Sequence, residues 1–175
     1  MNVLITGAFG FIGKNLDSKL QSKGYNVYRT TREDSLTQLA TLAQKCDVVV
    51  HLAGENRAAD VAEFDKNNRE YTKDLCDIIK GFGRPIKVLY ASSIQAETNS
   101  PYGLSKLCAE EALLKLEVDR NIGLKIFRLP NVFGKWSRPN YNSVVDTFCY
   151  NINHNLPITI NDPFHEINLV YIDDV

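Results

Sequence analysis

The sequence predicts an α/β fold in which a doubly wound parallel sheet carries helices on both faces. Short aliphatic runs alternate along the chain with segments whose apolar residues recur at helical spacing, and a glycine-rich turn follows the first run. Only fourteen residues separate Thr31 from Cys46, too few for the extra strand and helix that many such sheets carry there. We therefore expect a Rossmann-type sheet that lacks this strand.

Each expected element has a local signal. Aliphatic runs that end in small or polar residues predict strands near residues 3–5, 27–28, 48–52, 88–90 and 124–127. Apolar residues three or four apart predict helices near 12–20, 36–42, 61–79 and 101–116. Gly24 is expected to end the first helix, whereas Ser100 as N-cap and Pro101 in the first helical position open the last one.

Length and composition indicate one globular domain covering residues 1–175. The chain is 44% hydrophobic and 23% charged with a net charge of −1, so no overall field favours nucleic acid or an anionic membrane. No apolar run reaches membrane-spanning length and no basic leader precedes the first strand, so we expect a cytoplasmic protein. The cysteines and histidines lack metal-ligand spacing, which predicts free thiols and no metal site.

The glycine-rich turn has the spacing G-x-x-G-x-x-G, with Gly7, Gly10 and Gly13 at its glycine positions. Between a strand and an amphipathic helix, such glycines let phosphate oxygens approach the backbone amides. The turn is therefore a candidate pyrophosphate cradle, and its other cofactor-binding candidates are Phe9, Phe11 and Ile12. A glycine-rich turn without a ligand is the alternative.

The end of the second strand bears on the choice between NADH and NADPH. Thr31 stands where NAD-binding folds usually place an acidic residue for the ribose, and Arg32 follows it. A guanidinium matches a 2′-phosphate, so we predict NADPH, with NADH the less favoured cofactor. Glu33 and Asp34 argue the other way, and a solvated surface charge is the alternative role for Arg32.

Tyr102 and Lys106 are four residues apart on a predicted helix, so they lie on one face. Reduction of a ketone needs a proton donor, and a nearby ammonium is expected to lower the pKa of the Tyr102 phenol. Lys106 is also expected to hydrogen-bond the nicotinamide ribose, so Tyr102 and Lys106 are cofactor-binding candidates as well. Ser93, at the end of the preceding strand, is the candidate donor of a hydrogen bond to the substrate oxygen, with Ser92 as its alternative. An exposed pair on a helix is the other interpretation of Tyr102 and Lys106.

Taken together, these motifs resemble the extended short-chain dehydrogenase/reductase family, the NAD-dependent epimerases and dehydratases. The similar stretches, in the order of the family, are residues 7–13, 51–54, 68, 92–93, 102–106, 128–134 and 170–175. Residues 92–96, 131–136, 139–144 and 147–150 resemble more closely the reductase half of bifunctional capsular polysaccharide enzymes of the CapF type. That resemblance implies NADPH-dependent reduction of the 4-keto group of a UDP-linked 2-acetamido-2,6-dideoxy-hexos-4-ulose.

The resemblance also implies roles for residues that the motifs alone do not explain. Leu52, Ala53 and Gly54 are expected on the adenosine and phosphate side of the cofactor, and Asn68 is a further cofactor-binding candidate. By the same resemblance, the nicotinamide is bordered by Pro130 and Val132, and the sugar nucleotide is contacted by Asn131, Asn140 and Asn142. Asn140 and Asn142 stand where a substrate loop is expected, and core packing or a polar turn is the alternative role for each of them.

Two departures from relatives narrow the expected chemistry to simple ketone reduction. Ile94 and Gln95 stand where dehydrating relatives carry acidic residues, and Gln95 stands where relatives that epimerise and reduce in one site carry cysteine. An NAD-dependent sugar-nucleotide 4-epimerase and a non-catalytic dinucleotide sensor remain alternatives.

Family members also continue beyond the point that corresponds to Val175. We therefore expect an N-terminal fragment without the substrate-covering part. The resemblance further implies a homodimer formed through the helices near 61–79 and 101–116.

Overall fold

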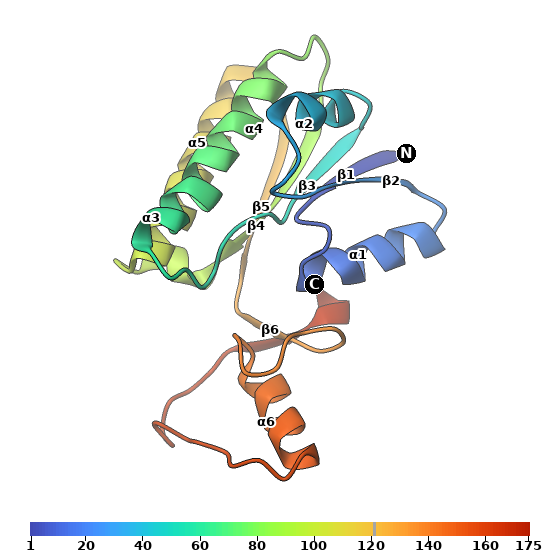
Figure 1. Cartoon of the computed structure of the whole chain (residues 1–175). Helices are drawn as coiled ribbons and strands as arrows, with labels where there is room; N and C mark the ends of the chain where they lie inside the picture. The colour runs from blue at the N-terminus through green and yellow to red at the C-terminus, as the bar shows by residue number, and fades with distance from the viewer. Residues whose placement is uncertain (121) are drawn as a thin grey trace. The chain divides into compact units, whose positions relative to one another are not determined.

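A computed structural model describes residues 1–120 and 122–175 of the chain (Figure 1). The chain divides into two compact units, Met1–Arg128 and Leu129–Val175. Among the described residues, no helix combines the length and apolar character needed to cross a bilayer.

The first unit is built on a five-stranded sheet with the order β2-β1-β3-β4-β5 (Figure 1). β1 pairs in parallel with both β2 and β3, and β3 pairs in parallel with β4. Because the chain leaves β1 in opposite directions, the topological switch point lies between β1 and β3, where open α/β sheets bind ligands. The strands are Asn2–Thr6 (β1), Asn26–Thr30 (β2), Val48–His51 (β3), Lys87–Ser93 (β4) and Gly123–Leu129 (β5).

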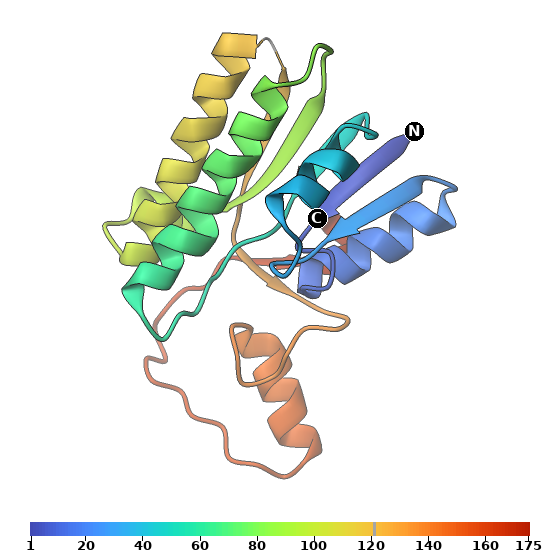
Figure 2. The ribbon, with the colours of Figure 1, turned by 45° about the horizontal axis from the view of Figure 1, so that its top comes forward.

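Helices cover both faces of this sheet (Figure 2), as the sequence predicted. Val3 and Ile5 of β1 pack towards α1, whereas Leu4 between them belongs to the core shared with α2, α4 and α5. This alternation follows from the two-residue period of a strand. The helices are Phe11–Ser22 (α1), Leu36–Ala43 (α2), Tyr71–Lys80 (α4) and Pro101–Arg120 (α5).

Local capping explains where these helices begin. Ser35 and Gln38 form a reciprocal capping box at the start of α2. The Ser100 hydroxyl accepts a hydrogen bond from the Gly103 amide at 3.0 Å, which confirms the predicted start of α5 at Pro101. Residues 31–47, all of which the structure describes, contain α2 and no strand, so the expected loss of that strand is also confirmed.

The helix predicted over 61–79 is interrupted. It consists of α3 (Val61–Phe64), a π-helical segment η1 (Asp65–Glu70) and then α4. Asn68 lies inside the wide turn, with 1% of its surface exposed, and its side chain bonds to groups outside the helix. The spacing of apolar residues did not predict this π-helical turn, because the residue buried inside it, Asn68, is polar.

The second unit contains a two-stranded parallel sheet of β6 (Asn131–Phe133) and β7 (Leu169–Tyr171). Between these strands lies α6 (Val144–Asn153), which Ser143 caps by accepting a hydrogen bond from the Asp146 amide at 3.2 Å. The Asp146 carboxylate in turn accepts hydrogen bonds from the Ser137 hydroxyl and the Gly134 amide. The short 3-10 helix η3 (Ile172–Asp174) follows β7.

Candidate active site

The turn after β1 brings the backbone of α1 directly against the sheet. Gly7 has φ +70°, and a Cβ atom there would lie 2.7 Å from the Ala53 nitrogen. A Cβ atom at Gly13 would lie 2.3 Å from the Gly7 carbonyl oxygen. Gly10 caps the helix with extended backbone and donates its N–H to that same carbonyl at 3.0 Å. The first amides of α1 have no partner within the helix, so this tightly packed turn fits a pyrophosphate.

A cleft of about 600 Å³ opens in front of the turn, within the size range of cofactor sites. Of the residues predicted to bind the cofactor, its walls contain Gly7, Phe9, Gly10, Arg32, Leu52, Ala53 and Gly54. Gly13 instead lies buried beneath the turn. The opposite wall comes from η1 and α4 and was not predicted, although its residues recur at helical spacing after the β3 loop: Lys66, Asn67, Glu70, Tyr71 and Asp74.

The rim of this cleft carries Arg32. Its side chain is 75% exposed and pairs with the Glu55 carboxylate at 3.4 Å. The Asp34 carboxylate accepts hydrogen bonds from the Thr31 amide at 2.7 Å and from the Thr31 hydroxyl at 3.2 Å, and so closes its own turn. Glu33 lines the cleft, so it is the acidic side chain of this turn that faces the cofactor space.

Ser93 and Tyr102 are brought together at the carboxyl end of β4. The Ser93 hydroxyl accepts a hydrogen bond from the Gln95 amide at 3.1 Å, capping the 3-10 helix η2 (Ile94–Glu97), and its side chain lies close enough to Tyr102 to lower the pKa of the phenol. Gly103 permits this contact, because a Cβ atom there would lie 2.2 Å from the Gln95 carbonyl oxygen. The Phe64 ring packs against Tyr102 with centroids 5.8 Å apart.

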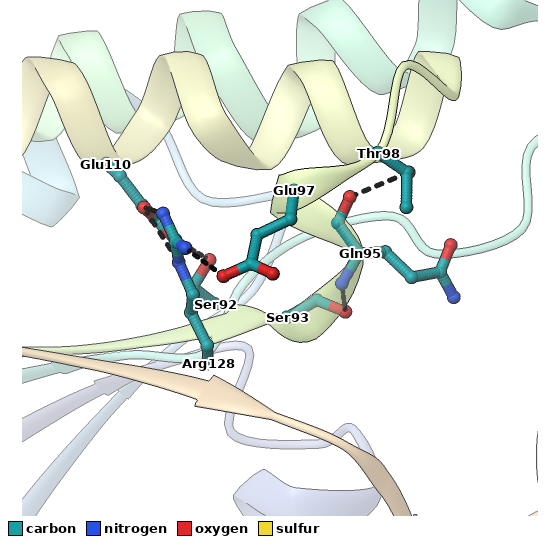
Figure 3. Close-up of polar contacts among 7 residues, drawn as sticks. All are labelled: Ser92, Ser93, Gln95, Glu97, Thr98, Glu110 and Arg128. Atoms are coloured by element: carbon teal, nitrogen blue, oxygen red, sulfur yellow. Dashed lines mark hydrogen bonds and ion pairs between the residues drawn. The ribbon is translucent and has the colours of Figure 1, made fainter. Parts of the chain in front are cut away.

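Ser92 points away from this pair. Its hydroxyl donates to the Glu110 carboxylate, on the side opposite to the Ser93 hydroxyl (Figure 3). Successive residues of a strand face opposite sides, so the two serines do not exchange roles. The geometry favours Ser93 over the alternative Ser92.

Lys106 is buried, with 5% of its surface exposed, one turn along α5 from Tyr102. Its ammonium donates to the Ala91 carbonyl at 2.7 Å and lies 4.3 Å from the centre of the Tyr90 ring. A Cβ atom at Gly54 would lie 3.8 Å from its Nζ, so the ammonium adjoins the cofactor cleft. Burial lowers the pKa of Lys106 to about 7, against the opposing charge of Glu110.

The predicted lowering of the Tyr102 pKa is not observed. Burial raises the pKa of Tyr102, and the neighbouring Ser93 side chain only partly offsets that effect. The physical reason is that burial disfavours the charged phenolate, and the Lys106 ammonium, which donates to the Ala91 carbonyl, does not offset that effect.

A chain of buried polar side chains joins β1 to α5. His51 bonds through Nδ1 to Thr6 at 2.7 Å and through Nε2 to Thr72 at 2.8 Å. The Thr72 hydroxyl donates to the Asn68 carbonyl at 2.6 Å, and the Asn68 amide donates to Ser105 Oγ at 2.8 Å. Burial lowers the pKa of His51 to about 3, so the imidazole is neutral. His51 stands in a stretch that resembles the family, but no local pattern indicated the positioning roles of His51, Thr72 and Ser105.

Asn68 was predicted to bind the cofactor, and in the structure it fastens the loop after β3. Its Oδ1 accepts from the Glu55 amide at 2.7 Å and its Nδ2 donates to the Glu55 carbonyl at 2.9 Å. The cofactor loop at Gly54 and the helix that carries Tyr102 are therefore held by one side chain. A direct contact between Asn68 and the cofactor stays a prediction.

The remaining predicted residues belong to the second unit: Pro130, Asn131, Val132, Asn140 and Asn142. Asn131 donates its backbone N–H to the Asn168 carbonyl at 3.1 Å. Asn140 has φ +54° and donates its amide N–H to Thr147 Oγ1 at 2.9 Å. Their contacts with nicotinamide and sugar stay predictions.

Comparison with known protein families shows to which family the chain belongs. The model of the family described as "NAD dependent epimerase/dehydratase family" matches residues 3–175. The chain belongs to this family. The glycine turn, the cleft and the sheet order are thus those of a dinucleotide-binding family, in agreement with the predicted fold class.

Individual relatives are more specific. The chain is 53% identical, over 176 residues, to a protein of Pseudomonas aeruginosa named UDP-2-acetamido-2,6-beta-L-arabino-hexul-4-ose reductase, covering 100% of this chain and 47% of the relative. It is 38% identical to the capsular polysaccharide assembling protein CapF of Staphylococcus aureus, with a TM-score of 0.86, covering 99% of this chain and 46% of that one. The chain thus spans about half the length of these relatives.

A more distant match concerns the fold. The UDP-glucuronic acid 4-epimerase of Bacillus cereus, solved in complex with NAD, is 24% identical, with a TM-score of 0.86. The alignment covers 99% of this chain and 71% of that structure.

Proposed function

We propose that this chain is the dinucleotide-binding reductase part of an enzyme that reduces the 4-keto group of a UDP-linked 2-acetamido-2,6-dideoxy-hexos-4-ulose with NADPH. The observation that carries the proposal is the pairing of Ser93 with Tyr102 at the carboxyl edge of the sheet, with the Lys106 ammonium beside Gly54 of the cofactor cleft. The 53% identity to a protein named as a reductase of such a sugar supports the choice of substrate.

The proposed chemistry divides between cofactor and chain. The cofactor supplies a hydride to the keto carbon when bound. Ser93 orients the keto oxygen by a hydrogen bond, and Tyr102 donates its phenolic proton to that oxygen as the alcohol forms. Because burial raises the pKa of Tyr102, the phenol stays protonated and is a donor at neutral pH. The phenolate left behind is reprotonated from solvent.

Lys106 has two roles in this scheme. Its ammonium binds the ribose next to Gly54, and it stabilises the phenolate that Tyr102 becomes after proton donation. With a pKa of about 7, the ammonium is partly charged at neutral pH, so the rate is expected to fall as the pH rises through that value.

NADPH is proposed over NADH because Arg32 is an exposed cation at the cleft rim and Asp34 is engaged in its own turn. Glu33, which also lines the cleft, is the side chain that favours NADH. The 2′-phosphate would replace or join the Glu55 carboxylate as the partner of the guanidinium. Lys66, also on the cleft wall, adds positive charge on the side of η1.

The decisive experiment supplies the UDP-linked 4-keto sugar and NADPH to the protein and follows the loss of NADPH absorbance together with the sugar product. The expected product is the 4-hydroxy sugar, formed with one NADPH consumed per sugar. Conversion of one UDP-hexose into its 4-epimer with no net oxidation of NADPH would identify a 4-epimerase instead. Tight NADPH binding with no turnover of either sugar would favour the sensor alternative.

Self-association through α4 and α5 stays part of the proposal. Leu104, Leu114 and Val118 are exposed on α5, and Val118 is 84% exposed. Light scattering on the protein is expected to give twice the monomer mass, and Val118→Glu is expected to shift the population to monomer.

A further inference from the structure

Behind the Ser93–Tyr102 pair lies an ionic cluster that the proposed reaction does not use. The Glu110 side chain of α5 is 5% exposed. Its carboxylate accepts hydrogen bonds from Ser92 Oγ, and from Arg128 Nε at 3.0 Å and Arg128 Nη2 at 2.7 Å (Figure 3). The third nitrogen of the same guanidinium, Nη1, donates to Glu97 at 2.8 Å.

We propose that Glu110 is a positioning residue of the active site: it fixes the end of β4 that carries Ser93, and it is the counter-charge that keeps the buried Lys106 ammonium protonated. The inference rests on the proposed function for the role of Ser93 and Lys106, although the cluster itself is a feature of the first unit alone.

The first half of the inference follows from the elements that meet at Glu110. Ser92 belongs to β4, Arg128 to β5 and Glu97 to η2, the 3-10 helix that Ser93 caps. One carboxylate and one guanidinium therefore tie both strand ends and η2 to α5. Holding Ser92 on one side of the strand fixes the direction of the Ser93 hydroxyl on the other side.

The second half concerns charge. Glu110 lies four residues after Lys106 on α5, so the two side chains share a helix face. The groups near the ammonium are the Tyr90 ring and the Ala91 carbonyl from β4 and the neutral His51 of β3. Each of these is uncharged at neutral pH, whereas Glu110 is an anion.

Glu110 remains ionised although it is buried. Burial opposes its ionisation, but the hydrogen bonds from Arg128 and Ser92 outweigh that effect and hold the pKa of the carboxyl below its ordinary value. Its charge in turn opposes the desolvation that lowers the pKa of Lys106. Arg128 thus keeps Glu110 ionised, and the ionised carboxylate in turn favours the protonated form of the buried lysine.

The test compares variants that remove charge with variants that keep it. Glu110→Gln preserves size and the bond with Ser92 but removes the charge; Glu110→Asp and Arg128→Lys keep the charge and disturb the geometry. The titration of Lys106 is followed by isotope-edited lysine NMR, with the resonance assigned from Lys106→Arg, and the pH profile of kcat is measured on the keto sugar.

In Glu110→Gln, the Lys106 titration and the alkaline limb of kcat are expected to move to lower pH by about one pH unit. In Arg128→Lys and Glu110→Asp the titration stays in place while kcat falls, because Ser93 is less well fixed. If Glu110→Gln does not fold, Glu110→Gln combined with Arg128→Met removes the unpaired cation and is expected to show the same shift.

An unshifted Lys106 titration in Glu110→Gln, or in the double variant, overturns the inference and leaves Glu110 a purely structural group. The NMR arm needs no keto sugar, so it separates this outcome from failure of the proposed function. Wild-type protein that does not reduce the keto sugar counts against the function, and the Lys106 titration still decides the role of Glu110.

Discussion

The candidate cofactor cradle after β1 and the candidate catalytic site at α5 differ in what forms them: the first is formed by backbone atoms and the second by side chains. The cradle is backbone: its surface exists because Gly7 and Gly13 have no Cβ atoms. The site formed by α5 and the end of β4, the α5 site, is made of the side chains of Ser93, Tyr102 and Lys106, and hydrogen bonds to the backbone hold Ser93 and Lys106. Adding atoms is therefore expected to damage the cradle, and removing atoms is expected to damage the α5 site.

Substitutions in the two regions are also expected to affect different properties, cofactor binding in the cradle and catalytic turnover at α5. A cradle substitution displaces α1 and with it every amide that faces the phosphates. A truncation on α5 leaves the backbone in place, because the helix is anchored elsewhere through Asn68 and Glu110. Stability, cofactor affinity and turnover should therefore respond differently in the two regions.

The largest expected effect is that of Tyr102→Phe. Loss of the proton donor is expected to lower kcat by roughly 10³-fold. NADPH affinity and the melting temperature are expected to stay near wild type, because the ring and its packing on Phe64 remain. Steady-state kinetics, fluorescence titration and thermal melts check these values. A parallel loss of NADPH affinity would show that the two regions are not separable.

The next effect is that of Gly13→Ala, in which the added Cβ atom meets the Gly7 carbonyl at 2.3 Å. The crowding is expected to cost about 2 kcal/mol in the free energy of unfolding and to weaken NADPH binding at least tenfold. Gly83→Ala is the matched control, because nothing lies within 4 Å of a Cβ atom there. Urea unfolding of both variants checks the difference, and equal losses would contradict it.

The His51 chain, which joins the two regions, gives a pH dependence. The folded pKa of about 3 lies below the ordinary histidine pKa of 6.5, so protonation favours the unfolded state. The contribution is fully present above pH 6.5 and is lost as the pH falls towards 3, with a slope of about 1.4 kcal/mol per pH unit. Urea unfolding between pH 7 and pH 5 measures it. His51→Gln is expected to lose stability at pH 7 but to show a shallower acid slope.

The smallest effect is expected at the cleft rim. Arg32→Ala is expected to weaken NADPH binding about tenfold and to leave NADH binding unchanged, because in the proposed complex the exposed guanidinium meets the 2′-phosphate, which NADH lacks. Arg32→Lys keeps the positive charge but loses the two-pronged guanidinium, so its NADPH affinity is expected to lie between those of the wild type and Arg32→Ala. Equal affinity of the wild type for NADPH and NADH would remove the basis for the cofactor choice.

The same contrast explains what the sequence could predict. The cradle depends on glycines that are close together in the chain, so spacing alone located Gly7, Gly10 and Gly13, and the start of α5 followed from Ser100 and Pro101. The orientation of Ser92 and the electrostatics of Lys106 depend on β4, α5 and a backbone carbonyl meeting in space. Apolar spacing predicts which face of a helix is buried but not how deeply a polar side chain such as Tyr102 is covered, so the direction of the Tyr102 pKa shift was predicted wrongly.

The wide turn η1 sets an angular relation between two walls of the active site. Before it, Phe64 packs on Tyr102; after it, Tyr71 lines the cofactor cleft and lies 5.8 Å from the His51 ring. Deleting one residue within Asp65–Glu70 would restore regular winding and rotate α3 by about 100° relative to α4. Phe64 and Tyr71 would then no longer contact their partners at the same time. The π-helical segment therefore sets the rotation of α3 relative to α4 that lets one helix line the cleft while the other packs on Tyr102.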